Sequence, residues 1–313
     1  RLLEAAACVG GRARTASDEL GVPFDRGCAW LHSAGRNPLR AHADALGVRY
    51  GGDPVMRYHV GGRFLAADET RALTDWWHGE RDAIRAAGAR GEDVAASAVL
   101  DAGHPHAPVR DYLVSAINGV APGEYATAEA AAEEDTHEDW IVWDGLGALV
   151  ARLAGGLDVV TACPARRLLH GAGGVELVTD RGRLRARAAI VTVSTGVLGA
   201  GAIAFDPPLP GWKRRALAAV PMGRAEKIAL RFDPDPFGLP PNTYVTVQHG
   251  DEVMGFHLVP GDAMLAVSYT GGPAAEAVAR GDPAALRERA LGFLERAFGA
   301  GPRRNLRAAT RTR

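Results

Sequence analysis

The sequence predicts an α/β protein with two interleaved domains. Its 313 residues can bury a large core and exceed the usual size of one domain. Residues 1–4 resemble the tail of a buried strand that ends in an acid, as in nucleotide-binding sheets. Strand-rich and helix-rich blocks then alternate along the chain. We therefore expect an incomplete Rossmann-like domain interleaved with an α+β domain, whose mixed or antiparallel sheet is flanked by helices.

The first thirty-two residues resemble part of a dinucleotide-binding motif. In a Rossmann unit, an acid at the end of the second strand hydrogen-bonds the adenosine ribose, about twenty residues after a Gly-rich turn. Glu4 matches that acid, but no such turn precedes it, so we expect a fragment. Gly10 and Gly11 would let backbone approach a pyrophosphate, and Arg12 would neutralise its charge. The alternatives are a solvated carboxylate and an ordinary glycine turn.

Composition narrows the class of protein. The formal net charge is −1, so nothing global points to nucleic acid or to an anionic membrane as a partner. Cys8, Cys28 and Cys163 form no CxxC pair, which favours free thiols and a cytoplasmic location. Residues 188–205 are eighteen residues without a charge, close to the minimum for a spanning helix. Their glycines and β-branched front half favour a buried strand followed by a turn.

Five segments have the features of helices. Apolar residues recur at helical spacing in the first, and Asp144 stands near the N-cap of the third. Asp282 followed by Pro283 begins the last, which ends at Gly299. The five segments are residues 68–89, 109–120, 144–154, 212–220 and 283–298.

Short runs rich in β-branched residues, separated by glycine-containing turns, predict two groups of strands. The first group is residues 157–162, 175–179 and 189–193, and the second, more antiparallel group is residues 227–232, 244–248, 254–259 and 264–269. The expected domains follow from these groups. Residues 1–53 and 140–205 form the dinucleotide-binding domain, residues 54–139 a helical part of the second domain, and residues 206–313 its sheet and remaining helices.

Lysine is rare in this chain. Lys213 and Lys227 are the two lysines, and the other 34 basic residues are arginines. Lysine is a compact ammonium whose pKa moves readily on burial, whereas arginine stays charged and planar. A surviving lysine is therefore a candidate for a position that arginine cannot serve, and the alternative is that both lysines are incidental.

Several blocks agree with one family. They are LEA at residues 3–5, CVGGR at 8–12, DRGCAWLH at 25–32, NPL at 37–39, DGLGAL at 144–149, AIVTVSTGVL at 189–198, PPLPGWK at 207–213 and GRAEK at 223–227. In this order they resemble the flavin-containing amine oxidases, which include monoamine oxidases, polyamine oxidases and the oxidase domain of histone lysine demethylases. The resemblance covers nearly the whole chain. Ala6 and Ser194 depart from it, because the family often has an arginine and a proline there.

The resemblance implies FAD as the cofactor and a substrate domain as the second domain. Glu4, Gly10, Gly11 and Arg12 would hold the dinucleotide, Gly27, Ala29 and Trp30 would lie near the flavin ring, and Ala165 replaces a valine whose backbone faces the adenine. Core packing is the alternative for Trp30.

Two further residues receive roles from the resemblance. The family's lysine at the position of Lys227 holds a water beside flavin N5, which makes Lys227 the catalytic candidate. A point-like donor on a flexible stem suits that role. Lys213 fits a surface helix better. His32 stands where some polyamine oxidases place a histidine close to the substrate, although a lone histidine is often satisfied locally.

The implied activity is FAD-dependent amine oxidation. A hydride equivalent would pass from the substrate's C–N unit to flavin N5, the imine would hydrolyse, and O2 would reoxidise the flavin to give H2O2. The partners would be a small-molecule amine and O2, with no nucleic acid and no membrane. No metal site is predicted, because the His104-Pro105-His106 run lacks a third ligand. Two alternatives stay open: a desaturase-type flavin enzyme of the same fold, and a non-catalytic fragment.

Overall fold

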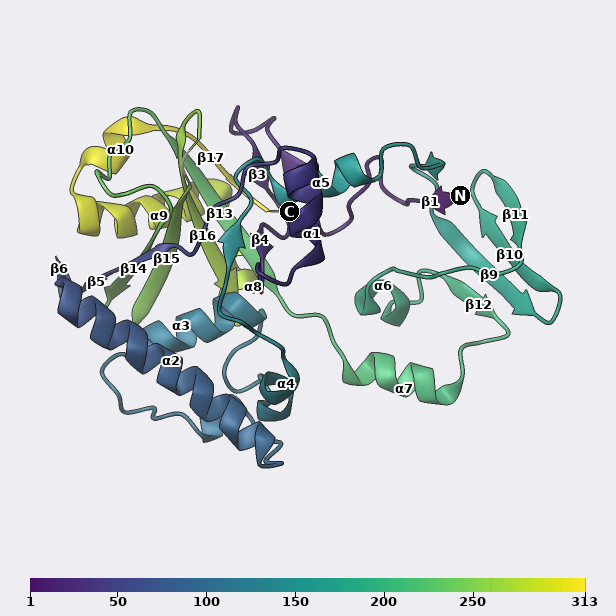
Figure 1. The fold of residues 1–313 in the computed structure, drawn as a ribbon, viewed down its shortest axis with the longest axis horizontal. Helices are drawn as coiled ribbons and strands as arrows, with labels where there is room; N and C mark the ends of the chain where they lie inside the picture. The colour runs from purple at the N-terminus through teal and green to yellow at the C-terminus, as the bar shows by residue number, and fades with distance from the viewer. Residues whose placement is uncertain (260, 313) are drawn as a thin grey trace. The chain divides into compact units, whose positions relative to one another are not determined.

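The computed structural model describes residues 1–259 and 261–312 (Figure 1). The chain forms two compact units, each assembled from two segments. Unit 1 comprises Arg1–Gly11 and Val150–Met222, and unit 2 comprises Arg12–Leu149 and Gly223–Arg313. The interleaving expected from the sequence is therefore present. The units change at residues 11, 149 and 222, whereas the expected domains changed at 53, 139 and 205. Their assignment to cofactor and substrate stays a prediction.

Unit 1 contains two small sheets and two short helices. A parallel pair joins β1 (Leu2–Leu3) to β8 (Val159–Val160). The second sheet has the order β11-β10-β9-β12. Its strands are β9 (Ala165–Gly171), β10 (Gly174–Thr179), β11 (Gly182–Ala186) and β12 (Ala204–Asp206), and the helices are α6 (Thr195–Gly199) and α7 (Gly211–Ala219). The glycine turns expected after residues 170 and 179 join the strands of this sheet.

The strand expected at residues 189–193 is wrong. This segment belongs to no strand, and Ile190 is 91% exposed. Its β-branched composition suits a strand, but a strand also needs a neighbour to accept its backbone hydrogen bonds, and the described residues place none beside it. Ser194 then caps α6 by accepting a hydrogen bond from the backbone N–H of Val197.

Across residues 1–259 and 261–312, no helix is long and apolar enough to cross a membrane.

Unit 2 is built on a seven-stranded sheet with the order β17-β13-β16-β15-β14-β5-β6. Its neighbours are antiparallel except for the parallel pair of β14 and β5. The strands are β5 (Val55–Val60), β6 (Arg63–Phe64), β13 (Ala225–Phe232), β14 (Thr243–His249), β15 (Glu252–Val259), β16 (Met264–Gly271) and β17 (Leu306–Arg311). The antiparallel sheet expected near the end of the chain is confirmed. β5 was wrongly included in a helical block.

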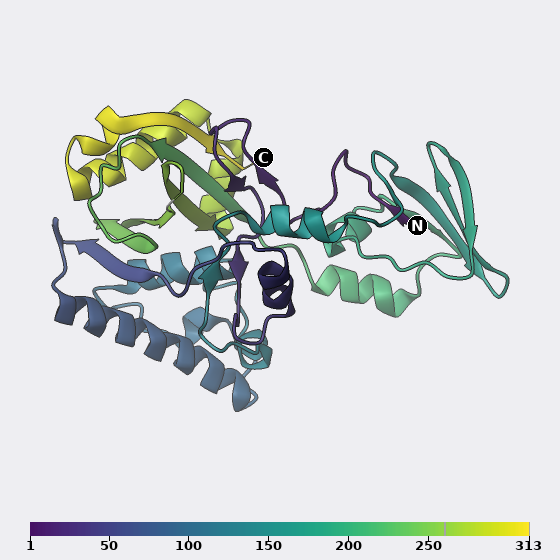
Figure 2. The same ribbon diagram turned by 45° about the horizontal axis from the view of Figure 1, so that its top comes forward.

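Helices cover both faces of this sheet (Figure 2). On one face, α8 (Gly272–Arg280) and α9 (Pro283–Phe298) pack against a core that includes Leu230, Phe232 and Phe256. On the other, α2 (Ala67–Ala89) and α3 (Ala107–Asn118) pack against β5. The expected start of α9 is confirmed, because the Asp282 carboxylate accepts a hydrogen bond from the Ala285 N–H at 2.9 Å. The remaining elements of the chain are β2 (Thr15–Ala16), β3 (Phe24–Asp25), β4 (Trp30–Leu31), α1 (Pro38–Ala45), a 3₁₀ turn (Ala96–Ala98), α4 (Thr127–Ala132), β7 (Trp140–Ile141), α5 (Leu146–Leu153) and α10 (Gly301–Asn305).

Candidate active site

Lys227 lies on β13, on the face of the sheet opposite α8 and α9, and is 8% exposed. Its Nζ donates hydrogen bonds to the main-chain oxygen of Asp25, at 2.7 Å, and to that of Gly27. The ammonium also lies over the ring of Tyr269, 5.1 Å from its centroid, and over that of Phe24 at 5.8 Å. These contacts fix the side chain and use two of its three protons.

Burial changes the acidity of this lysine. It lowers the pKa of Lys227 to about 8, while the negative charge of Asp25 acts in the opposite direction. A lysine with such a pKa exchanges its proton near neutral pH, unlike an exposed lysine. A group that can both donate and accept a proton is what acid–base work at this position needs.

The loop that receives Lys227 is held by close backbone packing. A Cβ added to Gly27 would lie 1.6 Å from the main-chain oxygen of Arg12, so only glycine fits there. The same oxygen of Arg12 accepts a hydrogen bond from the N–H of Cys28 at 3.0 Å. Gly27 therefore has a packing role besides the one expected for it beside the flavin. The Arg12 side chain is exposed.

A small cavity lies beside Lys227 within unit 2. It has a volume of about 30 Å³, room for about one water molecule. Its wall includes Ala29, Trp143, Lys227 and Tyr269, and is otherwise largely apolar. The cavity would suit one ordered water held by the remaining proton of Lys227, in agreement with the role expected from the family resemblance.

Trp30 forms part of an aromatic layer on the same face of the sheet. Its ring stacks on His257 with centroids 4.8 Å apart, and its centroid lies 6.1 Å from that of Tyr269. Tyr244 stacks behind His257 at 6.2 Å. Trp30 is half-buried, so part of its surface faces away from this layer. The layer gives the indole a fixed orientation.

His257 is a fully buried neutral base. Asn242 donates through Nδ2 to the main-chain oxygen of Gly52 at 2.8 Å, so its Oδ1 faces Nε2 of His257, also at 2.8 Å. Nε2 must therefore carry the proton, which leaves Nδ1 as a buried acceptor with no partner in the described residues. Burial, together with the charge of Lys227, lowers the pKa of His257 to about 3.

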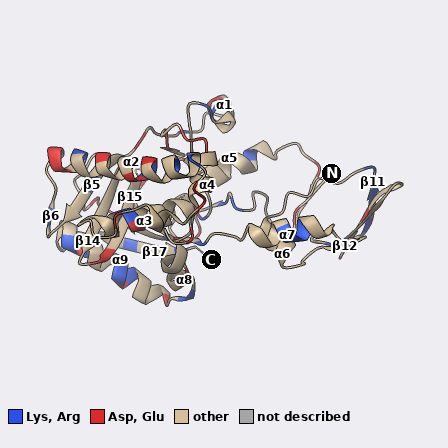
Figure 3. Cartoon of the chain, turned by 90° about the horizontal axis from the view of Figure 1, so that it is seen from below, with Lys and Arg blue, Asp and Glu red and all other residues tan. Residues whose placement is uncertain are grey.

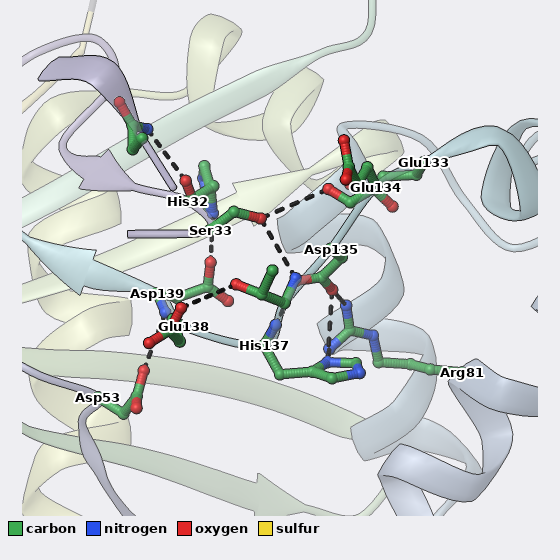
Figure 4. Close-up of polar contacts among 12 residues, drawn as sticks. His32, Ser33, Asp53, Arg81, Glu133, Glu134, Asp135, His137, Glu138 and Asp139 are labelled. Carbon is green, nitrogen blue, oxygen red and sulfur yellow. Dashed lines mark hydrogen bonds and ion pairs between the residues drawn. The ribbon is translucent and has the colours of Figure 1, made fainter. Parts of the chain in front are cut away.

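His32, the expected substrate residue, lies in an acidic surface region (Figure 4). Its Nδ1 is 2.6 Å from a carboxylate oxygen of Asp139, and that contact raises the pKa of His32. Asp135, close by, is paired with Arg81. His32 is exposed and does not line the cavity beside Lys227. Its role towards a substrate stays a prediction.

Unit 1 carries the other expected cofactor residues. Glu4 follows β1 and is bound to the β8 segment through its N–H, which donates to Val160 at 2.9 Å, and through its carbonyl, which accepts from Cys163 at 2.9 Å. The Glu4 carboxylate accepts a hydrogen bond from the N–H of Ala6 at 2.7 Å. This strand-end position is the one that the ribose-binding hypothesis requires.

The glycine pair and Ala165 also lie in unit 1. Gly10 and Gly11 have φ values of 111° and 54°, a region that side chains rarely adopt. A Cβ added to Gly11 would meet no atom within 4 Å, so the backbone faces open space. An exposed turn of this kind fits the approach of a phosphate group. Ala165 begins β9, two residues after Cys163. The open Gly11 turn and the strand-end position of Glu4 fit the dinucleotide-binding roles expected of them.

Sequence reasoning missed three residues around Lys227. Tyr269 and His257 occupy adjacent strands as part of alternating patterns, which resemble those of any half-buried sheet. Asp25 was quoted as part of the DRGCAW block but received no role. A buried carboxylate beside a Phe in a short strand was the signal that could have identified it. Among the described residues, no group of three or more His, Cys, Asp or Glu side chains could hold a metal ion.

Comparison with known proteins gives the class, which is an α/β flavoprotein of the oxidoreductase class. A family model described as flavin containing amine oxidoreductase matches residues 1–86 and 118–310. The chain belongs to this family, which confirms the FAD cofactor expected from its sequence. Polyamine oxidase 4 of Oryza sativa subsp. japonica is 27% identical over 263 residues, or 74% of this chain and 54% of the relative. The chain therefore spans about half the length of that relative.

Further similar proteins and solved structures are also oxidases or demethylases by their names. Lysine-specific histone demethylase 2 of Homo sapiens is 35% identical over 89 residues, which are 28% of this chain and 11% of the relative. The cyclohexylamine oxidase from Brevibacterium oxydans IH-35A has a TM-score of 0.75 at 20% identity, over 99% of this chain and 78% of that one. Wild-type putrescine oxidase bound to putrescine has a TM-score of 0.73 at 19% identity and the same coverage. These two likenesses establish the fold.

Proposed function

We propose that the protein containing this chain is an FAD-dependent amine oxidase that acts on a primary or secondary amine or a polyamine, with O2 as the electron acceptor and H2O2 as a product. The observation that carries the proposal is Lys227, buried on β13 beside a water-sized cavity and held by two backbone carbonyls. Family membership supports it. Bound FAD would supply the two-electron oxidation of the C–N unit and pass the electrons to O2.

The residues of unit 2 would prepare the site for this reaction. Lys227 would hold one water in the cavity through its third proton, and it can exchange a proton with that water near neutral pH. Trp30 and Tyr269 would provide rigid aromatic walls, since both belong to the layer around His257. Apolar residues form most of the cavity wall.

The charge of Lys227 also bears on the form of the substrate. An ammonium substrate would meet a like charge in surroundings of low dielectric, which is unfavourable. The site therefore favours the neutral amine, the form whose nitrogen lone pair is available for oxidation. The substrate would release its proton before or on entering.

The test uses the whole protein that contains this chain, purified with its flavin. It is mixed anaerobically with a panel of mono-, di- and polyamines while the flavin absorbance is followed. We expect at least one amine to bleach the oxidised flavin spectrum, and admission of O2 to restore it with release of H2O2. A flavin that no amine reduces would contradict the proposal.

A further inference from the structure

Asp25, whose main-chain oxygen accepts a hydrogen bond from Lys227, also carries a buried carboxylate. Asp25 is 7% exposed, and its carboxylate accepts hydrogen bonds from the N–H groups of Leu146, at 2.8 Å, and Gly147, at 3.1 Å. The Thr15 hydroxyl donates a third at 2.5 Å. The main-chain oxygen of the same aspartate accepts a hydrogen bond from Lys227 Nζ. One residue therefore connects the start of α5 to the lysine.

The hydrogen-bond partners of Asp25 favour its ionised form, although burial raises its pKa above the usual value. All three partners of the carboxylate are hydrogen-bond donors. Two of them are N–H groups in the first turn of α5, which have no acceptor within the helix and lie where the helix dipole favours negative charge. Burial raises the pKa of Asp25, while the Thr15 hydroxyl, the two N–H groups and Lys227 oppose that rise.

The packing around α5 leaves little freedom for this arrangement. A Cβ added to Gly145 would lie 2.4 Å from the Thr15 hydroxyl oxygen, and one added to Gly147 would lie 2.3 Å from the Thr15 nitrogen. The same hydroxyl accepts a hydrogen bond from the N–H of Ala148 at 2.7 Å. Thr15 and the helix start thus hold the Asp25 carboxylate from both sides.

The other titratable groups that face Lys227 are neutral at neutral pH. Burial raises the pKa of the Cys28 thiol and that of the Tyr269 phenol, so both keep their protons. His257 has a pKa of about 3 and carries no charge. Among the described residues that interact with the ammonium, Asp25 is therefore the one that supplies a negative charge.

We infer that Asp25 is a positioning residue for Lys227: it anchors the segment 25–27, whose main-chain oxygens accept hydrogen bonds from Nζ, and its carboxylate favours the charged form of Nζ. The inference concerns the lysine in the free protein, and only its consequence for catalysis rests on the proposed function. Removal of the carboxylate would leave the buried Lys227 ammonium without a compensating negative charge, so the neutral form of the Lys227 side chain would become more favoured.

The experiment exploits the scarcity of lysine. In the whole protein labelled with ¹³C at lysine Cε, these 313 residues contribute two signals, from Lys213 and Lys227, and Lys213→Arg and Lys227→Arg assign them. Each signal reports ionisation of its own ammonium during a pH titration. Asp25→Asn should lower the Lys227 midpoint by about one pH unit or more. Asp18→Asn, which removes the same charge from an exposed side chain of the neighbouring segment, should move it by less than about 0.3 units.

A measurement on the unsubstituted protein guards against an Asp25→Asn variant that does not fold. The Lys227 signal should show a second inflection in acid, at a pH above 3.8, as Asp25 takes up its proton. Thr15→Val should move that inflection to higher pH, because the carboxylate loses a donor. An unchanged Lys227 midpoint in folded Asp25→Asn, or an acid range without an inflection, would overturn the inference.

The result is separable from the proposed function. The titration requires neither flavin nor amine, so the coupling of Asp25 to Lys227 can be present in a protein that oxidises no amine. That outcome would contradict the oxidase and leave the inference standing. Amine oxidation by a protein whose Lys227 titrates independently of Asp25 would do the reverse.

Discussion

Unit 1 and unit 2 differ in how many side chains each buries. Every residue of unit 1 is described, and just three are buried: Cys163, Leu168 and Thr179. Unit 2 holds continuous apolar clusters on both faces of its sheet. Nine large hydrophobic residues of unit 1 are exposed, namely Leu2, Leu157, Ile190, Val191, Val193, Val197, Trp212, Val220 and Met222. Since apolar burial is the main favourable term in folding, the stability of this chain resides in unit 2.

The two units also differ in formal charge, and Figure 3 marks the charged residues along the chain. Unit 1 has 11 basic and 5 acidic residues, a formal charge of +6, and unit 2 has 25 and 32, a formal charge of −7. The chain's net charge of −1 conceals this separation. A basic unit suits the pyrophosphate of a dinucleotide, whereas an acidic unit suits a cationic amine that approaches from solution. The difference is in line with the separate cofactor and substrate domains that the sequence predicts.

The largest expected effect is on stability, and it separates the units. Phe232→Ala removes a fully buried ring from unit 2 and should reduce the free energy of unfolding by about 3–5 kcal/mol. Ile190→Ser, at a 91% exposed position of unit 1, should change it by less than about 0.5 kcal/mol. Urea unfolding followed by circular dichroism measures both. Equal losses would show that unit 1 has a core that the structure does not reveal.

A smaller effect is the loss of stability in acid, which we expect to arise from His257 in unit 2. His257 has a pKa of about 3 when folded, against 6.5 for an ordinary histidine, so only the unfolded chain takes up its proton between these values. Its contribution to stability is therefore complete above about pH 6.5 and falls by up to about 1.4 kcal/mol per pH unit below it.

The check on His257 compares two histidine substitutions. His257→Phe keeps an aromatic ring against Trp30 without a titrating group, and should flatten the dependence of the unfolding free energy on pH between 4 and 6.5. His249→Phe, at an exposed position of β14, should leave the slope as it was. A variant at residue 257 that keeps the original slope would place the acid sensitivity elsewhere.

The smallest effect belongs to the surface of unit 2. The contact of His32 with Asp139 raises the pKa of His32, so its contribution is present below the ordinary histidine pKa and is lost as pH rises through the folded value. The side chains are 70% and 39% exposed, which limits the contribution to less than about 1 kcal/mol. In an NMR titration, Asp139→Asn should lower the His32 pKa. No change would mean that the pair does not persist in solution.

The sequence located the parts of the site that local motifs carry. Glu4 was found from its strand-end position and Lys227 from its rarity together with the family motif, and the structure places Glu4 at a strand end and Lys227 in a buried site. Partners from distant segments could not be seen. The Asp25 carboxylate accepts hydrogen bonds from Thr15 and from the start of α5. The start of α5 lies more than a hundred residues later in the chain, and no local sequence pattern predicts that contact.

The errors in the fold have the same origin. Residues 189–193 have the composition of a buried strand, but no described strand lies beside them to pair with. β5, in contrast, becomes a strand by pairing in parallel with β14, almost two hundred residues later. Composition describes what a segment tolerates, while its hydrogen-bond neighbour decides whether it joins a sheet.

The most direct test of the oxidase compares the chain's two lysines. In the whole flavin-loaded protein, Lys227→Met and Lys213→Met each remove one ammonium, the first beside the buried cavity and the second on exposed α7. With an amine that reduces the flavin, stopped-flow absorbance gives the rates of flavin reduction and reoxidation. We predict that Lys227→Met retains FAD but slows one of these rates by about 10²-fold or more, while Lys213→Met leaves both unchanged. Unchanged rates in Lys227→Met would contradict the account.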